Sequence, residues 1–75
     1  MNKERRANLR NYRRLLMQAK SGIESIRDAE DDARDNMPEN LCYSNRYEES
    51  EECSEAMDSA VDAIGSAIGY IDDVI

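Results

Sequence analysis

Two segments of this chain place mostly small or apolar residues alternately three and four positions apart. Such alternation over several heptads keeps one side of a helix turned toward one partner helix, which is typical of a coiled coil. The sequence therefore predicts an all-α fold with helices near residues 3–35 and 46–74, joined by a turn near 36–45. The periodic positions are Leu9, Tyr12, Leu16, Ala19, Ile23, Ile26, Glu30, Ala33 and Met37, then Ser50, Cys53, Met57, Ala60, Ile64, Ala67, Ile71 and Val74.

A single breaker region, "DNMPENLCYSN" from residue 35 to residue 45, separates these segments. Pro38 disfavours helical geometry at the residue before it, and the Asn and Ser residues around it favour turns and helix caps. Asn45, with Glu48 three residues later, resembles a capping box and is the expected start of the second helix. We expect residues 38–41 to form one short helical turn.

A connection this short makes the two helices antiparallel neighbours. Paired periodic positions have residue numbers with a constant sum of 83, as antiparallel helices require, and several pairs set a large side chain against a small one, as a two-helix seam requires. The expected pairs are Leu9/Val74, Tyr12/Ile71, Leu16/Ala67, Ala19/Ile64, Ile23/Ala60 and Ile26/Met57. Toward the turn, Glu30 falls opposite Cys53. Either the helices splay apart at that end and are hydrated, or a buried polar residue there fixes the register.

The positions beside the seam differ on its two sides. With Leu9 as heptad position a, position e is basic throughout the first helix and mostly aliphatic in the second half of the second helix. We expect the basic stems to lie over the aliphatic side chains while their charged groups reach water. The basic residues are Arg6, Arg13, Lys20, Arg27 and Arg34, and the aliphatic residues are Val61, Ile68 and Ile75.

Position g carries small or apolar residues that no charged side chain covers. A chain of 75 residues forms one small domain, and a lone hairpin buries little, so this strip is suited to docking a second hairpin. We expect a homodimer that forms a four-helix bundle, with a monomer or a hairpin bound to another protein as alternatives. The expected oligomer interface is Leu15, Gly22, Ala29, Ala56, Ala63 and Tyr70. Gly65 and Gly69 face away from the seam, where either a partner approaches closely or the helix is weak.

Charge is unevenly distributed along a chain whose net charge is -7. Residues 1–23 carry seven basic residues and one acidic residue, whereas residues 24–62 carry fourteen acidic and three basic residues. The acidic end either binds a basic protein surface or only keeps the turn solvated. Its expected partner-binding residues are Asp31, Asp32, Asp35, Glu48, Glu49, Glu51, Glu52 and Glu55. Candidate phosphate contacts at the basic end are Arg5, Arg6, Arg10 and Arg14, which would bind nucleic acid; the alternative is that Arg6 covers the seam and the other three only solvate the helix.

Composition argues against most catalytic and metal-binding classes. The chain has no His and only two Cys, Cys42 and Cys53, without the spacing of a zinc site, and we expect both thiols to be reduced. The acidic runs lack the ligand spacing and the turn-forming Gly of a calcium loop. A hairpin offers no cleft for acid–base catalysis, and the serines have no base beside them. We therefore expect no enzyme, no cofactor and no membrane span.

The pattern "DNMPENL", followed by Ser44, Arg46 and Glu48 and then by "EAMDSAVDAIGSAIGYIDDVI", resembles a group of small acidic proteins encoded by phages and prophages of gut Firmicutes. Members of that group share an Ala/Ile-repeating second helix and often a basic start like "NKERR". Gly65 and Gly69 depart from the group, whose members have acidic or polar residues there. The resemblance implies an accessory protein in the cytoplasm of a bacterial host cell. Small phage proteins of this kind often bind and block host or defence proteins.

Two functional hypotheses follow from these features. The first is a protein-binding or inhibitory module that uses the acidic end or the position-g strip. The second is a nucleic-acid-binding accessory protein that uses the Arg-rich start of the chain.

Overall fold

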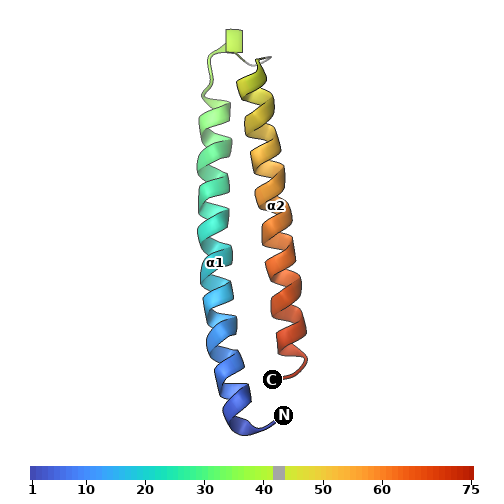
Figure 1. The fold of residues 1–75 in the computed structure, drawn as a ribbon. Coiled ribbons are helices and arrows are strands. Elements are labelled where there is room, and N and C mark those ends of the chain that lie inside the picture. The colour runs from blue at the N-terminus through green and yellow to red at the C-terminus, as the bar shows by residue number, and fades with distance from the viewer. Residues whose placement is uncertain (42–43) are drawn as a thin grey trace.

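The computed structural model describes residues 1–41 and 44–75, and all regular structure within these ranges is helical. Helix α1 spans Lys3–Asp35, a 3-10 turn η1 spans Glu39–Leu41, and helix α2 spans Asn45–Asp72. The two long helices lie side by side and antiparallel, so both termini lie at one end, the open end, and η1 lies at the other, the turn end (Figure 1). The hairpin is a rod with extents of 59 × 14 × 12 Å.

Local sequence signals explain where the helices begin and end. Asn2 caps α1, because its side-chain oxygen accepts a hydrogen bond from the Arg5 amide at 2.8 Å. The expected helical turn before the second helix is present as η1, closed by a 2.8 Å bond from the Leu41 amide to the Pro38 carbonyl. The predicted cap of the second helix was wrong by one residue. Ser44 caps α2 by accepting from the Tyr47 amide, and Asn45 is already helical.

The contact between the helices follows heptad positions a and e of both helices. We call these partly covered residues the seam. They again alternate by three and four residues, and their antiparallel order aligns the start of α1 with the end of α2. The seam comprises Leu9, Arg13, Leu16, Lys20, Ile23, Arg27, Glu30 and Arg34 from α1, Met37 just after its end, Tyr47, Ser50, Ser54, Met57, Val61, Ile64, Ile68 and Ile71 from α2, and Ile75 just after its end.

The prediction that the d residues of α1 lie in the contact with α2 was wrong. Tyr12 and Ile26, expected in the seam, are both 61% exposed, and Ala19 and Ala33 are exposed as well. Val74 of the expected pair Leu9/Val74 is also 46% exposed.

The helices are rotated about their axes, so that positions a and e meet in place of the expected a and d. The side chains of α2 explain this rotation. Its e residues Val61 and Ile68 are larger than its d residues Ala60 and Ala67, so a contact turned toward e buries more apolar area. Ala60 and Ala67 stay half-buried beside this contact, while Cys53, a further expected seam residue, is exposed.

The core of the hairpin is thin. Among the described apolar residues only Val61, at 7% exposure, is buried, and the two other buried residues are Ser50 and Ser54. Because burial of apolar area is the main term that stabilises a fold, a single hairpin with this core has little to stabilise it.

Candidate interaction surfaces

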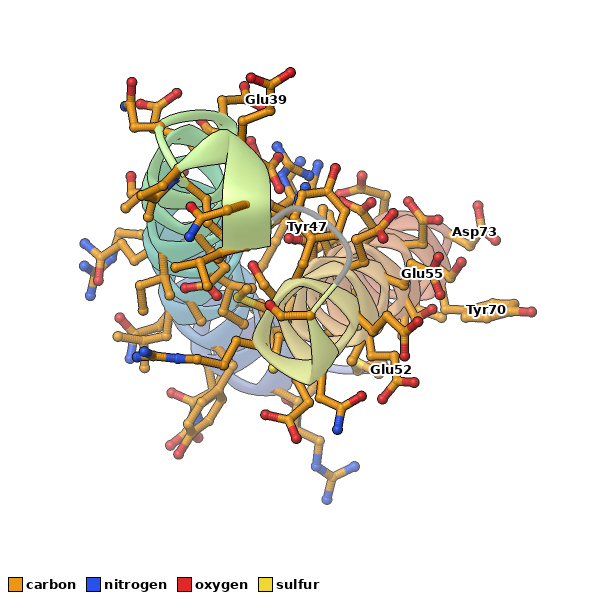
Figure 2. All side chains as sticks on the ribbon, turned by 90° about the horizontal axis from the view of Figure 1, so that it is seen from above. Glu39, Tyr47, Glu52, Glu55, Tyr70 and Asp73 are labelled. Atoms are coloured by element: carbon orange, nitrogen blue, oxygen red, sulfur yellow. The ribbon has the colours of Figure 1, made fainter. Side chains whose placement is uncertain are left out.

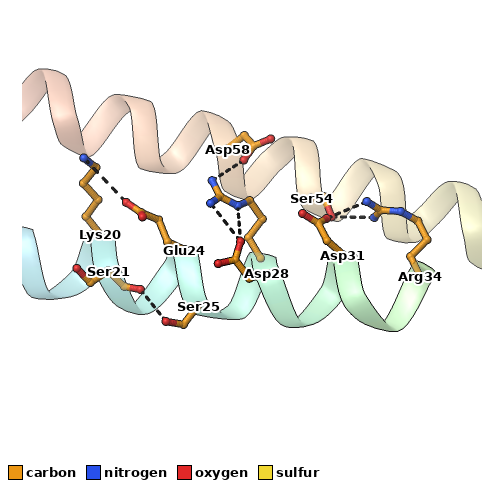
Figure 3. Close-up of polar contacts among 10 residues, drawn as sticks. Lys20, Ser21, Glu24, Ser25, Asp28, Asp31, Arg34, Ser54 and Asp58 are labelled. Atoms are coloured by element: carbon orange, nitrogen blue, oxygen red, sulfur yellow. Dashed lines mark hydrogen bonds and ion pairs between the residues drawn. The ribbon is translucent and has the colours of Figure 1, made fainter. Parts of the chain in front are cut away.

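A polar network occupies the half of the seam near the turn (Figure 3). The guanidinium group of Arg34 on α1 donates to Ser50 Oγ at 3.2 Å and to Ser54 Oγ at 2.8 Å, both on α2. Asp31 Oδ1 accepts from Arg34 Nη2 at 2.8 Å and from Ser54 Oγ at 2.7 Å. These bonds satisfy the buried hydroxyl groups of both serines. The seam is therefore closed at this end by serines and an ion pair, rather than by Glu30.

The network perturbs the two ionised groups that belong to it. Hydrogen bonds from Ser54 and then from Arg34 hold the pKa of Asp31 below its ordinary value. For Arg34, burial opposes the charge, but the hydrogen bond and the attraction to Asp31 outweigh it and raise the pKa. Both groups therefore stay charged near neutral pH, and Asp31, expected on the partner-binding acidic surface, is instead used inside the hairpin.

The basic e residues of α1 also tie the two helices together. Arg27 Nη1 donates to Asp58 Oδ1 of α2 at 2.8 Å, and Arg13 Nε donates to Asp72 Oδ1 at 2.5 Å. Hydrogen bonds to Asp58 and to the neighbouring Asp28 raise the pKa of Arg27. The charged groups of Arg13 and Arg27 stay partly exposed, and the rotation toward e also brings carboxylates of α2 within their reach. Ion pairs this exposed add little stability, but they fix the register.

The remaining carboxylates near the turn point outward. Seen along the rod from the turn end, Glu39, Glu52 and Glu55 extend away from the seam (Figure 2). The exposed carboxylates of the predicted acidic surface, which we call the acidic turn end, make no ion pair within the described part of the chain. They are Asp32, Asp35, Glu48, Glu49, Glu51, Glu52 and Glu55.

One long side of the hairpin is apolar and exposed over both helices. Rotation of the seam toward e leaves positions d and g on one side of each helix, and antiparallel pairing puts these two sides on the same side of the rod. We call this surface the lateral face. It consists of Tyr12, Leu15, Ala19, Gly22, Ile26, Ala29 and Ala33 from α1, and of Cys53, Ala56, Ala63, Tyr70 and Val74 from α2.

The lateral face contains every residue of the predicted oligomer interface, and all of these are exposed. Tyr70, for example, is 76% exposed and extends away from α1 (Figure 2). From Tyr12 to Ala33 and from Cys53 to Val74, positions d and g carry no charged residue. Sequence reasoning assigned the d residues to the seam and so found only half of this face. The missed signal was that d and g are uncharged together in both helices, which indicates a second contact surface.

The candidate phosphate-binding arginines lie at the open end. Arg5, Arg6, Arg10 and Arg14 are exposed along the first turns of α1. The Arg14 guanidinium donates to Asn11 Oδ1 at 2.8 Å, and its three neighbours make no side-chain hydrogen bond or ion pair with any described residue. Three guanidinium groups on a single helix are thus without a partner among residues 1–41 and 44–75.

The other candidate sites, for a metal ion, a membrane, a reactive thiol or a close backbone contact, have less support in the structure. Within residues 1–41 and 44–75, no group of three His, Cys, Asp or Glu side chains is placed to hold a metal ion. Neither described helix has the apolar length that a bilayer crossing requires. Cys53 has a free, exposed thiol, and Cys42, the other thiol expected to be reduced, lies outside the described residues. A Cβ atom added at Gly22, Gly65 or Gly69 would meet nothing within 4 Å, so no close approach inside the hairpin requires these glycines.

Comparisons of the chain with protein-family models, with curated proteins and with solved structures found no match. The surfaces described above, the lateral face and the acidic turn end foremost, are therefore the basis for a functional proposal.

Proposed function

We propose that this protein is a non-enzymatic protein-interaction module that pairs with a second copy through its lateral face and binds a basic protein through its acidic turn end. The observation that carries the proposal is the lateral face itself. It exposes large side chains such as Tyr12, Ile26 and Tyr70, while the seam buries only Val61 among the described apolar residues. Contiguous exposed apolar surfaces of this kind mark protein-interaction sites.

The electrostatics of the hairpin favour binding over catalysis. Perturbed pKa values often mark catalytic groups, but they also arise in structural ion-pair networks. Among the described residues, the three groups with shifted pKa values, Arg27, Asp31 and Arg34, lie on α1 and all bond to residues of α2. Bonds within α1, between Arg34 and Asp31 and between Arg27 and Asp28, together with the bonds to α2 account for the shifts, which supports a structural role.

Sedimentation velocity of Ala63→Glu tests the pairing. A carboxylate in the middle of the lateral face would be buried unpaired in a dimer, so we expect this variant to sediment as a monomer at concentrations where the native chain is dimeric. Ser59→Glu is the matched control, because Ser59 is exposed at heptad position c of the same helix, opposite the seam, and should leave the dimer intact. A native chain that stays monomeric at all concentrations would refute the pairing.

The acidic turn end supports the second half of the proposal. Its carboxylates are concentrated at one end of a rod, and two of the three cations in this half of the hairpin, Arg27 and Arg34, are already paired within it, while Arg46 is exposed. Such a surface attracts basic proteins, including those with nucleic-acid-binding channels, and steers them to one orientation. The resemblance to small phage proteins fits an inhibitor of a basic host or defence protein in the bacterial cytoplasm.

Pull-down from bacterial lysate with matched neutralised variants tests this binding. Glu52→Gln with Glu55→Gln removes two charges from the acidic turn end, whereas Glu4→Gln with Asp73→Asn removes two charges from the open end. We expect a basic protein to be recovered by the native chain at low salt, by the open-end variant to the same extent, and much less by the turn-end variant. Equal recovery by both variants would contradict a role for the acidic turn end.

A second candidate function is nucleic-acid binding, which the exposed guanidinium groups of Arg5, Arg6 and Arg10 favour. It predicts retention of DNA or RNA in a gel-shift assay at low salt, and loss of this retention when these arginines and Arg14 are replaced by Gln. The acidic residues Asp72 and Asp73 at the same end oppose this binding, and we therefore rank it second. Absence of any shift at low salt would exclude it.

A further inference from the structure

We infer that the two hairpins pair antiparallel, with the turn end of one copy beside the open end of the other and a two-fold axis crossing the lateral face near Gly22 and Ala63. This inference rests on the proposed pairing through the lateral face and adds its geometry. A two-fold axis that brings one face against its own copy lies in the plane of contact. It runs either along the rods, which makes the hairpins parallel, or across them, which makes them antiparallel.

The distribution of charge favours the antiparallel arrangement. Residues 1–23 have a net charge of +6 and residues 63–75 of -2, so the open end is positive. Residues 24–62, which form the turn end, have a net charge of -11. Parallel hairpins would set two negative turn ends together, whereas antiparallel hairpins set each negative end beside a positive one. Like charges brought together across an interface are costly, and complementary ends fix its orientation.

The sizes of the side chains on α1 favour the same arrangement. When α1 lies antiparallel on its copy, each large side chain of the lateral face falls opposite a small one. Gly22 then meets Gly22 of the second copy, which lets the two backbones approach at the axis. The pairs are Tyr12 with Ala33, Leu15 with Ala29, and Ile26 with Ala19.

The residues of α2 give the same result independently. With α2 antiparallel on its copy, Tyr70 falls opposite Ala56 and Val74 opposite Cys53, and Ala63 meets its own copy at the axis. In a parallel pair, α1 would instead lie on α2 of the other copy. Tyr12 would then meet Tyr70 and Val74 at the crowded open end, while small residues would face each other at the turn end. Interiors pack to high density, so large against small is the better fit.

The axis positions found on the two helices agree with the register of the hairpin. The ion pairs Arg13–Asp72 and Arg27–Asp58 set that register. Gly22 lies as far along α1 from Arg13 as Ala63 lies along α2 from Asp72. The two residues are therefore level with each other, and one two-fold axis passes through both of the positions found from the side-chain sizes, Gly22 on α1 and Ala63 on α2.

The size of the lateral face suits a stable dimer. From Tyr12 to Ala33 it is roughly 32 Å long, and two adjacent helices are about 20 Å wide, which gives a footprint of roughly 650 Å² per copy. A typical stable interface buries about 800 Å² per partner. The accessible area buried would exceed the footprint, because side chains interdigitate.

Spin labels at the open end distinguish the two arrangements. In a Cys42→Ser, Cys53→Ser background, first shown by sedimentation to be dimeric, Lys3→Cys is labelled and the distance between labels is measured by double electron–electron resonance. Lys3 lies far from Gly22 along α1, so antiparallel copies place the two labels about 57 Å apart at 1.5 Å per residue. In parallel copies the labels share one end of the bundle and are separated only by its width, about 30 Å or less.

A disulfide provides the second readout. In the same background, Ala63→Cys should cross-link two copies on mild oxidation, because the antiparallel axis brings the two Cα atoms within the roughly 7 Å that a disulfide allows. Ser59→Cys, which lies outside positions d and g and four residues from the axis position, is the control and should not cross-link. A long label distance with the cross-link supports the inference. A short label distance in a protein that is still dimeric overturns the antiparallel geometry and leaves the pairing standing, whereas a monomer overturns both.

Discussion

Truncation of Val61 should destabilise the hairpin more than truncation of Ile26, although it removes fewer carbon atoms. Val61 is 7% exposed in the seam, and Ile26 is 61% exposed on the lateral face. At about 0.8 kcal/mol per buried CH₂, the two carbons lost from Val61 contribute about 1.6 kcal/mol, and the three lost from Ile26, largely uncovered, contribute about 1 kcal/mol. Ala is the better helix former at both positions by about 0.5 kcal/mol, and a cavity adds to the loss at Val61. We expect losses of about 1–2 kcal/mol for Val61→Ala and about 0.5 kcal/mol for Ile26→Ala.

Thermal unfolding followed by circular dichroism at 222 nm measures this difference in protein dilute enough to be monomeric. For a domain of this size the expected loss lowers the Tm of Val61→Ala by about 5–15 °C, and that of Ile26→Ala by a few degrees. At higher concentration Ile26→Ala should lose more, because the lateral face then contributes to stability. If Ile26→Ala unfolds at or below the temperature of Val61→Ala in the monomer, the seam follows position d and the lateral face described here is incorrect.

The remaining predictions concern single contacts. Ser44→Ala should lower the stability of the hairpin by about 1 kcal/mol in urea unfolding, and Asn45→Ala should have little effect, since Ser44 caps α2; an equal loss in both would contradict this cap. Asp31→Asn should destabilise the hairpin at neutral pH. Because folding lowers the pKa of Asp31, its contribution is complete above the unfolded value of 3.8 and disappears as the pH falls through the lower folded value, so the difference from the native chain should vanish in acid. Gly65→Ala and Gly69→Ala should each raise the stability by up to about 1 kcal/mol, because an added methyl group meets nothing; a loss of stability would show that these sites are occupied.

The sequence predicted the two helices, their antiparallel contact and the residues at position a. Spacing alone sufficed for these features, because Leu9, Leu16 and Ile23 recur regularly and Pro38 interrupts the only connection. The rotation of the helices about their axes was predicted incorrectly. In α2 the residues at both d and e are apolar, so the pattern allows either position to join position a in the contact with α1. Only the larger volume of Val61 over Ala60 favours position e.

The polar contacts were harder to predict from the sequence. Ser50 falls at a periodic position, but the surrounding residues are those of an exposed acidic helix, and nothing in the spacing indicates that Ser54 is buried as well. Their burial depends on Arg34, which lies far away in the sequence and reaches them only once the seam has turned toward e. The lateral face followed from the same rotation, and for that reason only its position-g half was predicted.

The elongated shape of the hairpin affects how its association must be measured. A rod of 59 × 14 × 12 Å has a high frictional ratio, so a monomer of 8.6 kDa elutes early from a gel-filtration column and imitates a larger compact protein. Side-by-side pairing doubles the mass and thickens the rod without lengthening it, which lowers the frictional ratio. End-to-end association would raise it. Sedimentation velocity reports mass and friction together, and it therefore separates a monomeric rod, a lateral pair and a linear chain of hairpins that elution volume alone would confuse.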